Sequence, residues 1–259
     1  MTQENYHAKI QYQEEKMKKI VLLGMVFCLF LSYVSADNTE QTNDQFDNDI
    51  KVVGPPSPMA APSANEQAMT FYNYGSLLLR ENRLEEAERY LKAAIDLDPL
   101  FVDAMDHLGM VYRRQNRLIE AEEIYLRSIG INNENKVPYQ NLAVVYRMQN
   151  RLNDAFELYR ILIQLDENDP EGYYGIGELF FMVGNYQNSM LFFDRAIELY
   201  INVNSPYVFD AFYYKGMAYY GMNDYDNALK YLEEALRGNP DNTAIRNTIN
   251  EIKRGVGRQ

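Results

Sequence analysis

The triplet Asn82-Arg83-Leu84 recurs in this chain as Asn116-Arg117-Leu118 and again as Asn150-Arg151-Leu152, and each copy begins 34 residues after the previous one. Small residues recur at the same step in two further rows: Gly75, Gly109, Ala143 and Gly177, and Ala87, Ala121, Ala155 and Ser189. The next step, from Gly177 to Gly216, is 39 residues long. A fixed period of this length is the signature of a fold built by stacking copies of one structural unit. The chain therefore divides into five units with five additional residues before the last, at 68–101, 102–135, 136–169, 170–203 and 209–242.

Each unit is predicted to contain two helices. In the fifth unit the apolar and small residues form two helical stripes, with spacings of three and four residues: Phe212, Gly216 and Tyr219, then Ala228, Leu232 and Ala235. The stretch Asn223-Asp224-Tyr225 between the stripes is a turn, and Pro240 closes the unit because a helix cannot continue through it. Small residues are expected where two helix backbones approach closely, with large side chains filling the space beside them.

This pattern resembles the tetratricopeptide repeat (TPR) family, and the resemblance covers 68–242. It implies an all-α fold, a right-handed α-solenoid of five TPR helix-turn-helix repeats. The tryptophan that is usual in the first helix of the family's repeat is replaced by another large apolar residue in every unit: Phe71, Met105, Tyr139, Tyr173 and Phe212. Lys215 stands where the other four units carry an apolar residue, so we expect its ammonium group to extend to the surface.

Both ends of the predicted repeat array, 65–242, carry signals for helices. Ser63-Ala64-Asn65-Glu66 has the pattern of a capping box that opens the first helix. After Pro240 the stripe Ile245, Ile249 and Ile252 predicts a further helix within 243–259. That helix would cover the apolar end of the last unit, as terminal elements of solenoids do.

The N-terminal segment has the layout of an export signal. Residues 17–36 begin with Met17 and two lysines, continue through an apolar run of about 15 residues, and end in Val34-Ser35-Ala36, which suits signal peptidase. The run is shorter than the ~20 residues that span a bilayer, so an uncleaved membrane anchor is the less favoured alternative. Residues 1–16 are acidic and unlike the start of a signal, which predicts that translation begins at Met17. Residues 37–64 are rich in Asp, Asn, Pro and Ala and are read as a flexible linker.

The composition excludes several classes of function. A net charge of −12 argues against nucleic-acid binding, which needs clustered Lys and Arg. The single cysteine, Cys28, lies in the signal segment, and only His107 remains in the folded part, so neither a disulfide nor the usual zinc ligand set is available. Phosphate-binding loops, nucleophile elbows and other catalytic motifs are missing from the sequence. We therefore expect no catalytic residues, no metal, no cofactor and no enzymatic activity.

The resemblance implies that the first helices of the units line the inner face of the solenoid, where TPR proteins commonly bind extended peptides. Arg113 and Arg147 would form a central cationic pair there, binding a carboxylate or a carbonyl, unless each is neutralised by a nearby Asp or Glu. Four aromatic residues of the last two units would form a wall for apolar side chains, unless they pack between neighbouring helices. The candidate contact residues are Tyr72, Asp106, Arg113, Gln140, Arg147, Tyr174, Glu178, Phe181, Tyr213 and Tyr220.

These observations favour an exported, non-enzymatic scaffold that binds a protein or peptide partner through its concave groove. The expected compartment is the bacterial periplasm or the extracellular space, since no Asn-x-Ser/Thr glycosylation site occurs despite abundant Asn. Membrane contact would occur only through the signal segment, if that segment stays uncleaved. Two alternatives remain open from the sequence: a structural subunit of an envelope assembly, and a small-ligand carrier or partner of a transporter's binding protein.

The signal assignment predicts that the mature protein begins at Asp37, after cleavage behind Ala36. N-terminal sequencing and intact-mass measurement of the protein purified from its native host check this. A mature chain that still begins at Met1 would contradict both the predicted start at Met17 and the cleavage.

Overall fold

A computed structural model describes residues 63–256 of the chain, and these residues form eleven α-helices and no strand. The helices are α2 (Glu66–Arg80), α3 (Leu84–Leu97), α4 (Val102–Arg114), α5 (Leu118–Ile131), α6 (Lys136–Met148), α7 (Leu152–Leu165), α8 (Pro170–Met182), α9 (Tyr186–Asn202), α10 (Val208–Gly221), α11 (Tyr225–Gly238) and α12 (Thr243–Val256). None of these helices has the length and the apolar character needed to cross a membrane. The predictions for 1–16, 17–36 and the linker up to residue 62 lie outside the described residues, as does the tail at 257–259.

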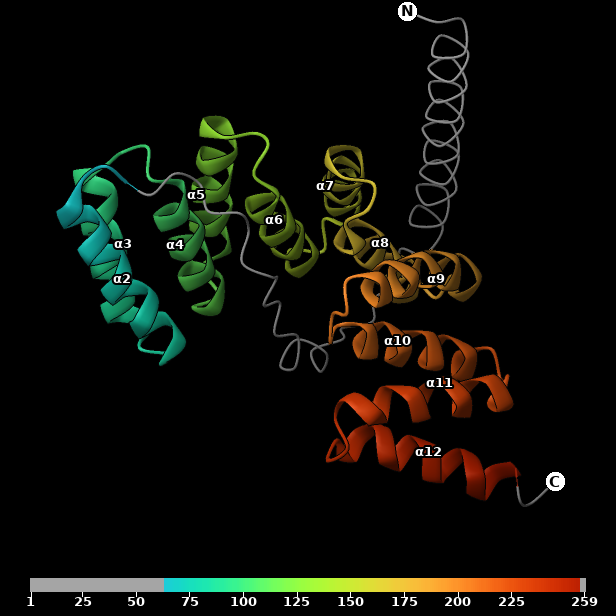
Figure 1. Ribbon diagram of the computed structural model, residues 1–259. Helices are drawn as coiled ribbons and strands as arrows, with labels where there is room; N and C mark the ends of the chain where they lie inside the picture. The colour runs from blue at the N-terminus through green and yellow to red at the C-terminus, as the bar shows by residue number, and fades with distance from the viewer. Residues whose placement is uncertain (1–62, 257–259) are drawn as a thin grey trace, which may run out of the picture.

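The described helices form a right-handed α-solenoid of five helical pairs, followed by α12 as a terminal helix (Figure 1). Helices α2, α4, α6, α8 and α10 are the first helices of the units, and the helix after each is the second helix. Each second helix also packs against the first helix of the next unit. In addition α2 contacts α4, α4 contacts α6 and α8 contacts α10, so the first helices together form one side of the array.

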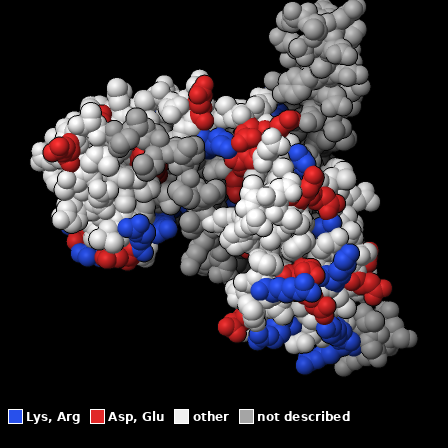
Figure 2. Space-filling model, viewed as in Figure 1, with Lys and Arg blue, Asp and Glu red and all other residues white. Residues whose placement is uncertain are grey.

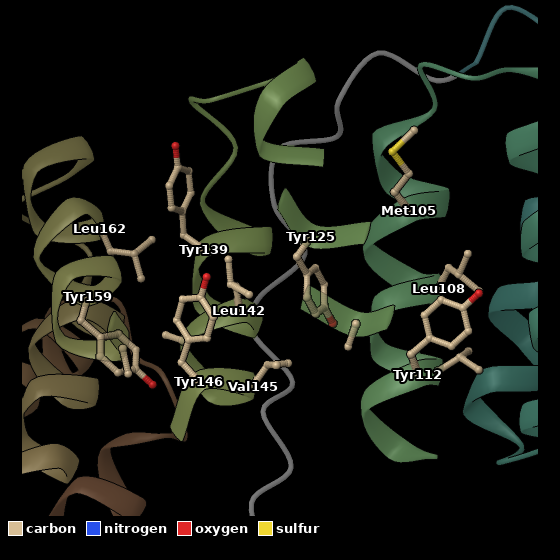
Figure 3. Close-up of a cluster of buried hydrophobic side chains, with 14 of the residues drawn as sticks. Met105, Leu108, Tyr112, Tyr125, Tyr139, Leu142, Val145, Tyr146, Tyr159 and Leu162 are labelled. Atoms are coloured by element: carbon tan, nitrogen blue, oxygen red, sulfur yellow. The ribbon is translucent and has the colours of Figure 1, made fainter. Parts of the chain in front are cut away.

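The two helices of a unit are held together at one small position in the first helix. A methyl group added at Gly109 would come within 2.5 Å of the ring of Tyr125, and one added at Gly177 would come within 2.9 Å of the ring of Phe193. Both rings are fully buried. Figure 3 shows part of this core, with Tyr125 and Tyr159 among the apolar side chains of α4 to α7. Full burial of one large apolar side chain of this kind contributes about 1.5–3 kcal/mol to the free energy of unfolding.

The turn inside each unit requires a left-handed backbone residue. The residue at this turn position has a positive φ in every unit. The values are 57° for Asn82, 57° for Asn116, 58° for Asn150, 73° for Gly184 and 61° for Asn223. Asparagine and glycine tolerate this conformation, whereas most other residues are strained by about 1–2 kcal/mol. The repeated asparagine of the sequence is therefore explained by the geometry of the turn.

The arginine that follows this asparagine joins neighbouring units in two places. Arg117 of the second unit pairs with Glu88 of the first at 2.7 Å, and Arg151 of the third unit pairs with Glu122 of the second at 2.9 Å. The guanidinium of Arg117 also lies 4.3 Å from the ring centroid of Tyr112. The repeated Asn-Arg pair thus sets both the turn within a unit and an ion pair between units.

Two local expectations are wrong, and one is refined. Lys215 does not extend to the surface: only 5% of the residue is exposed, and its ammonium group pairs with Asp194 and lies 4.2 Å from the ring centroid of Tyr231. The N-cap of α2 is Asn65 rather than Ser63, because the Asn65 side chain accepts hydrogen bonds from two backbone N–H groups of the first turn. The five additional residues before the last unit mainly lengthen α9, which has 17 residues against 14 in the other second helices.

The C-terminal end of the array is covered by α12. Ile245, Ile249 and Ile252 are 5%, 5% and 3% exposed and form one cluster with Leu232 and Ala235 of α11. The predicted stripe therefore does face the last unit. The opposite side of α12 is polar, as is usual for the terminal element of a solenoid.

The close contact between α4 and α5 predicts that Gly109→Ala destabilises the protein by about 2 kcal/mol, because the added methyl group overlaps a buried ring that has no free space. Thermal unfolding should show a midpoint lowered by roughly 5 °C. Gly130→Ala is the matched control: nothing lies within 4 Å of its added methyl group, and alanine favours the helix by up to about 1 kcal/mol. Equal midpoints for the two variants would contradict the proposed contact.

Candidate functional site

The inner face formed by the first helices is the candidate site, and it contains all the predicted contact residues. Their helices are α2 for Tyr72, α4 for Asp106 and Arg113, α6 for Gln140 and Arg147, α8 for Tyr174, Glu178 and Phe181, and α10 for Tyr213 and Tyr220. Three of the ten residues are buried, namely Asp106, Arg147 and Glu178, and the other seven are partly exposed. The seven partly exposed residues are therefore accessible to a partner, whereas the three buried ones contact other residues of this protein.

The centre of this face holds an ion pair between neighbouring units. Arg147 Nη1 donates to Glu178 Oε2 at 2.5 Å, and the two side chains are 7% and 5% exposed. Burial opposes the charge of Arg147, but the negative charge of Glu178 outweighs this and raises the arginine's pKa. Of the two alternatives for Arg147, the structure shows the ion pair. Removing either partner would leave a buried charge uncompensated, which typically costs 3–5 kcal/mol.

Arg113 differs from Arg147, although the sequence places them one period apart. Its side chain is partly exposed, and within residues 63–256 no carboxylate forms an ion pair with it. Its Nε atom is buried without a hydrogen-bond partner, as is Oε1 of Glu178. Buried polar atoms are rarely left without partners. Arg113 is therefore a cation without an ion-pair partner among the described residues, and one of its own nitrogens has unused hydrogen-bonding capacity.

The N-terminal part of the inner face is a network within the protein. Asp106 is 3% exposed and accepts hydrogen bonds from Ser128 Oγ at 2.6 Å and Asn135 Nδ2 at 3.0 Å. Burial raises the pKa of Asp106 to about 7, although these two hydrogen bonds act in the opposite direction. His107 stacks on the ring of Tyr72 at 5.0 Å, and burial lowers its pKa to about 4. Asp106 thus connects α4 with α5 and with the N-cap of α6.

The C-terminal part is aromatic, and some of its rings pack between helices. Tyr174 and Phe181 of α8 lie 5.9 Å and 5.4 Å from the ring of Tyr214 on α10. Tyr214 follows Tyr213 in the sequence and was not among the predicted site residues. Tyr213 and Tyr220 are partly exposed on α10. Tyr174, Phe181 and Tyr213 are thus joined through Tyr214, whereas Tyr220 lies apart from them and packs against Tyr225 of α11 at 6.0 Å.

A second carboxyl group with a raised pKa, that of the partly buried Glu171, does not follow from the sequence pattern. Glu171 of α8 accepts a hydrogen bond from the hydroxyl of Tyr200 on α9 at 2.7 Å. Burial raises the pKa of Glu171 to about 7, and nearby Asp169, Glu178 and Asp210 add to the rise. Nothing in the repeat pattern identifies this group, because its environment is created by helices of two units. Within the described part of the chain, no group of three or more His, Cys, Asp or Glu side chains is arranged to hold a metal ion.

The fold and this surface define a helical-repeat protein of the α-solenoid class. Two family models described as "Tetratricopeptide repeat" match residues 72–135 and 170–241, and one described as "TPR repeat" matches residues 145–184. These matches together cover more than half of the sequence. The chain belongs to the tetratricopeptide repeat family. No curated protein sequence matches it.

Several solved structures share the fold at low sequence identity. A chain in the crystal structure of the APC/C hetero-tetramer Cut9-Hcn1 matches 72% of this chain with a TM-score of 0.65 and 21% identity, and only 36% of that longer chain is covered. Pseudomonas aeruginosa pilF matches 74% of this chain and is 91% covered, with a TM-score of 0.61 and 19% identity. YrrB, described as a TPR protein with an unusual peptide-binding site, matches 70% and is 91% covered, with a TM-score of 0.50 and 24% identity. At these identities the matches establish the fold alone.

The raised pKa of the partly buried Glu171 predicts a stability that falls as pH rises. Its carboxyl group keeps its proton up to about pH 7 in the folded chain but releases it near its ordinary pKa of about 4.3 when unfolded. The folded state therefore binds more protons between these values, and its free energy of unfolding decreases as pH increases through this window. The lowered pKa of His107 acts in the opposite direction below about pH 6.5.

Comparison with Glu171→Gln isolates the contribution of this group. The wild type should lose stability relative to the variant between about pH 5 and pH 8, measured by urea unfolding at each pH. Glu123→Gln, at an exposed position of α5, is the control and should keep the wild-type pH dependence. A wild type and a Glu171→Gln variant with parallel pH profiles would contradict the burial effect.

Proposed function

We propose that the protein is an exported, non-catalytic scaffold that binds an extended segment of a partner protein along its inner face. The TPR family is a scaffold for protein–protein interactions, and this supports the general part of the proposal. The fold similarity to YrrB, whose own description mentions a peptide-binding site, is consistent with use of the same kind of surface. Export to the bacterial periplasm or the cell exterior rests on the signal pattern at 17–36.

The observation that carries the proposal is the position of Arg113. It lies on α4, the second of the five first helices, without a carboxylate partner among the described residues, in a protein with a net charge of −12. An arginine that is partly desolvated and unpaired can bind a carboxylate or a backbone carbonyl with good geometry. The partner segment should therefore place an acidic side chain, a C-terminal carboxylate or a carbonyl group at this point.

The aromatic residues of α10 supply the second element of recognition. Tyr213 and Tyr220 are partly exposed, and tyrosine is enriched in protein interfaces because a rigid amphipathic ring buries much area at low entropic cost. They favour an apolar or aromatic residue of the partner toward the C-terminal end of the inner face. Arg147, Glu178 and Asp106 are assigned to the support of this surface, because each is buried and bonded within the protein.

The alternative of an envelope subunit that docks through α12 is less well supported. The exposed side of α12 is polar, with Asn247, Asn250 and Arg254 on its surface. Figure 2 shows acidic and basic side chains interspersed over the region of α10 to α12 on this face of the molecule. Stable assemblies usually bury a more apolar surface. The small-ligand carrier remains an alternative without a specific observation in its favour.

Site-specific photo-crosslinking in the full-length chain tests the inner face. A benzoylphenylalanine at Tyr213 should give a discrete crosslinked product in the native host, whereas one at Leu126, on the exposed side of α5, should not. Adding Arg113→Glu should reduce the product at Tyr213 by about tenfold or more, since reversal of a binding charge typically costs at least 1.4 kcal/mol. Arg89→Glu, an equal charge reversal at an exposed position of α3, should leave it unchanged.

Products of equal intensity at the two crosslinking positions would contradict binding to the inner face. A product that persists at full intensity with Arg113→Glu would instead contradict the role of the arginine. Far-ultraviolet circular dichroism of each variant establishes that the solenoid remains folded.

A further inference from the structure

The N-terminal end of the solenoid exposes an apolar surface on α2 and α3, which we call the end face and define by Phe71, Tyr74, Leu77 and Tyr90. Tyr74, Leu77 and Tyr90 are 55%, 44% and 37% exposed. The ring of Tyr90 lies 5.7 Å from that of Tyr74 and 6.0 Å from that of Phe71. These side chains therefore form one continuous aromatic surface rather than scattered exposed residues. Contiguous apolar patches of this kind usually mark an interaction site.

The same position is buried in the units that follow. Tyr74 corresponds, at intervals of one period, to Leu108, Leu142 and Ile176, which are 3%, 0% and 0% exposed. In those units the first helix is covered by the second helix of the preceding unit, through the contacts of α3 with α4, α5 with α6 and α7 with α8. No helix of the described residues 63–256 precedes the first unit, and the other end of the array is covered by α12. The end face is thus a helix-binding surface that no described helix covers.

The inner units show which kind of helix this surface binds. The covering helices α3 and α5 are amphipathic, and each provides a glutamate to the arginine that follows the turn asparagine of the next unit. These pairs are Glu88 with Arg117 at 2.7 Å and Glu122 with Arg151 at 2.9 Å. Each of these two covering helices therefore has an apolar stripe and an acidic side chain at the edge of that stripe.

The first unit keeps the arginine but has no such glutamate before it. Arg83 occupies the position of Arg117 and Arg151, and among the described residues its ion-pair partners are Glu81 and Glu86 of its own unit. Its side chain is 52% exposed, so these two contacts contribute little to stability. A carboxylate brought by a docked helix can therefore bind Arg83 at small cost.

We propose that the end face binds an amphipathic helix of a partner protein, with an apolar stripe over Tyr74 and Tyr90 and an acidic residue beside Arg83. A second copy of this chain fits less well. The acids beside its own end face, Glu81 and Glu86, are already paired with Arg83, and the exposed side of its α12 carries Arg246, Lys253 and Arg254 against Glu251. Binding here is separate from binding to the inner face, because Tyr74 and Arg83 are not inner-face residues.

The probe for this surface is a peptide of residues 82–101 of this chain, which contains α3, the helix that covers α4. Isolated helices of this length are marginally stable, so the peptide carries a hydrocarbon staple across positions 85 and 89, which are exposed in α3. Fluorescence anisotropy with the full-length chain measures its dissociation constant. Tyr74→Glu should raise that constant about tenfold or more, because it places a charge in the centre of the contact.

Two further comparisons make the measurement specific. Asn153→Glu adds the same charge at an exposed position of α7 and should change the dissociation constant by less than about twofold. Arg83→Glu should weaken the peptide's binding, and a peptide with Glu88→Arg should restore affinity to this variant while binding the wild type less well. Such a reciprocal exchange is expected only when the two charges are adjacent.

Several results would overturn the proposal. The first is that the peptide does not bind the wild type, and the second is that it binds the wild type and Tyr74→Glu with equal affinity. The third is that the Glu88→Arg peptide fails to restore affinity to the Arg83→Glu variant. Sedimentation velocity of the chain alone provides the last test. Self-association that Tyr74→Glu abolishes would show that a second copy occupies the end face. Crosslinking at Tyr213 is unaffected by Tyr74→Glu under this proposal, so failure here and failure at the inner face are distinguishable.

Discussion

The contact between a residue without a side chain and a large one opposite it determines how close the two helices of a unit lie. Gly109 meets Tyr125 and Gly177 meets Phe193, in both cases at a distance that leaves no room for a methyl group. Because the same contact recurs at a fixed interval, each unit has nearly the same shape, and similar units stack into a regular curve. The inner face, the covered C-terminal end and the exposed N-terminal end all follow from that stacking.

The turn and the interface between units are set by adjacent residues. Asn116 takes the left-handed conformation that closes the turn, and Arg117 then points back to Glu88 of the preceding unit. Since a repeat contacts only its neighbours, its stability depends on both its own packing and this interface. The first unit has one interface fewer than the others, which is why its α2 surface remains partly exposed and available.

The inner face combines residues with two different roles. The ion pair of Arg147 and Glu178 is buried and links the third and fourth units, so each charge is neutralised within the protein rather than offered to a ligand. Arg113, one period earlier, meets no such carboxylate among the described residues and keeps its capacity for binding. Identical amino acids at equivalent repeat positions therefore differ in role, because the residue opposite each is supplied by the next unit and is not repeated.

The sequence by itself determined the all-α fold, the five units, the terminal helix and the helices that carry the site, because a 34-residue period and a helical apolar pattern permit one type of packing. It did not determine which inner-face residues are accessible, nor the role of Glu171, nor the burial of Lys215 beside Asp194. Those properties depend on contacts between side chains that are distant in the sequence, and only the tertiary structure brings such groups together. The end face has the same origin: Tyr74 matches its buried equivalents in the repeat pattern, and only the absence of a preceding described helix leaves it exposed.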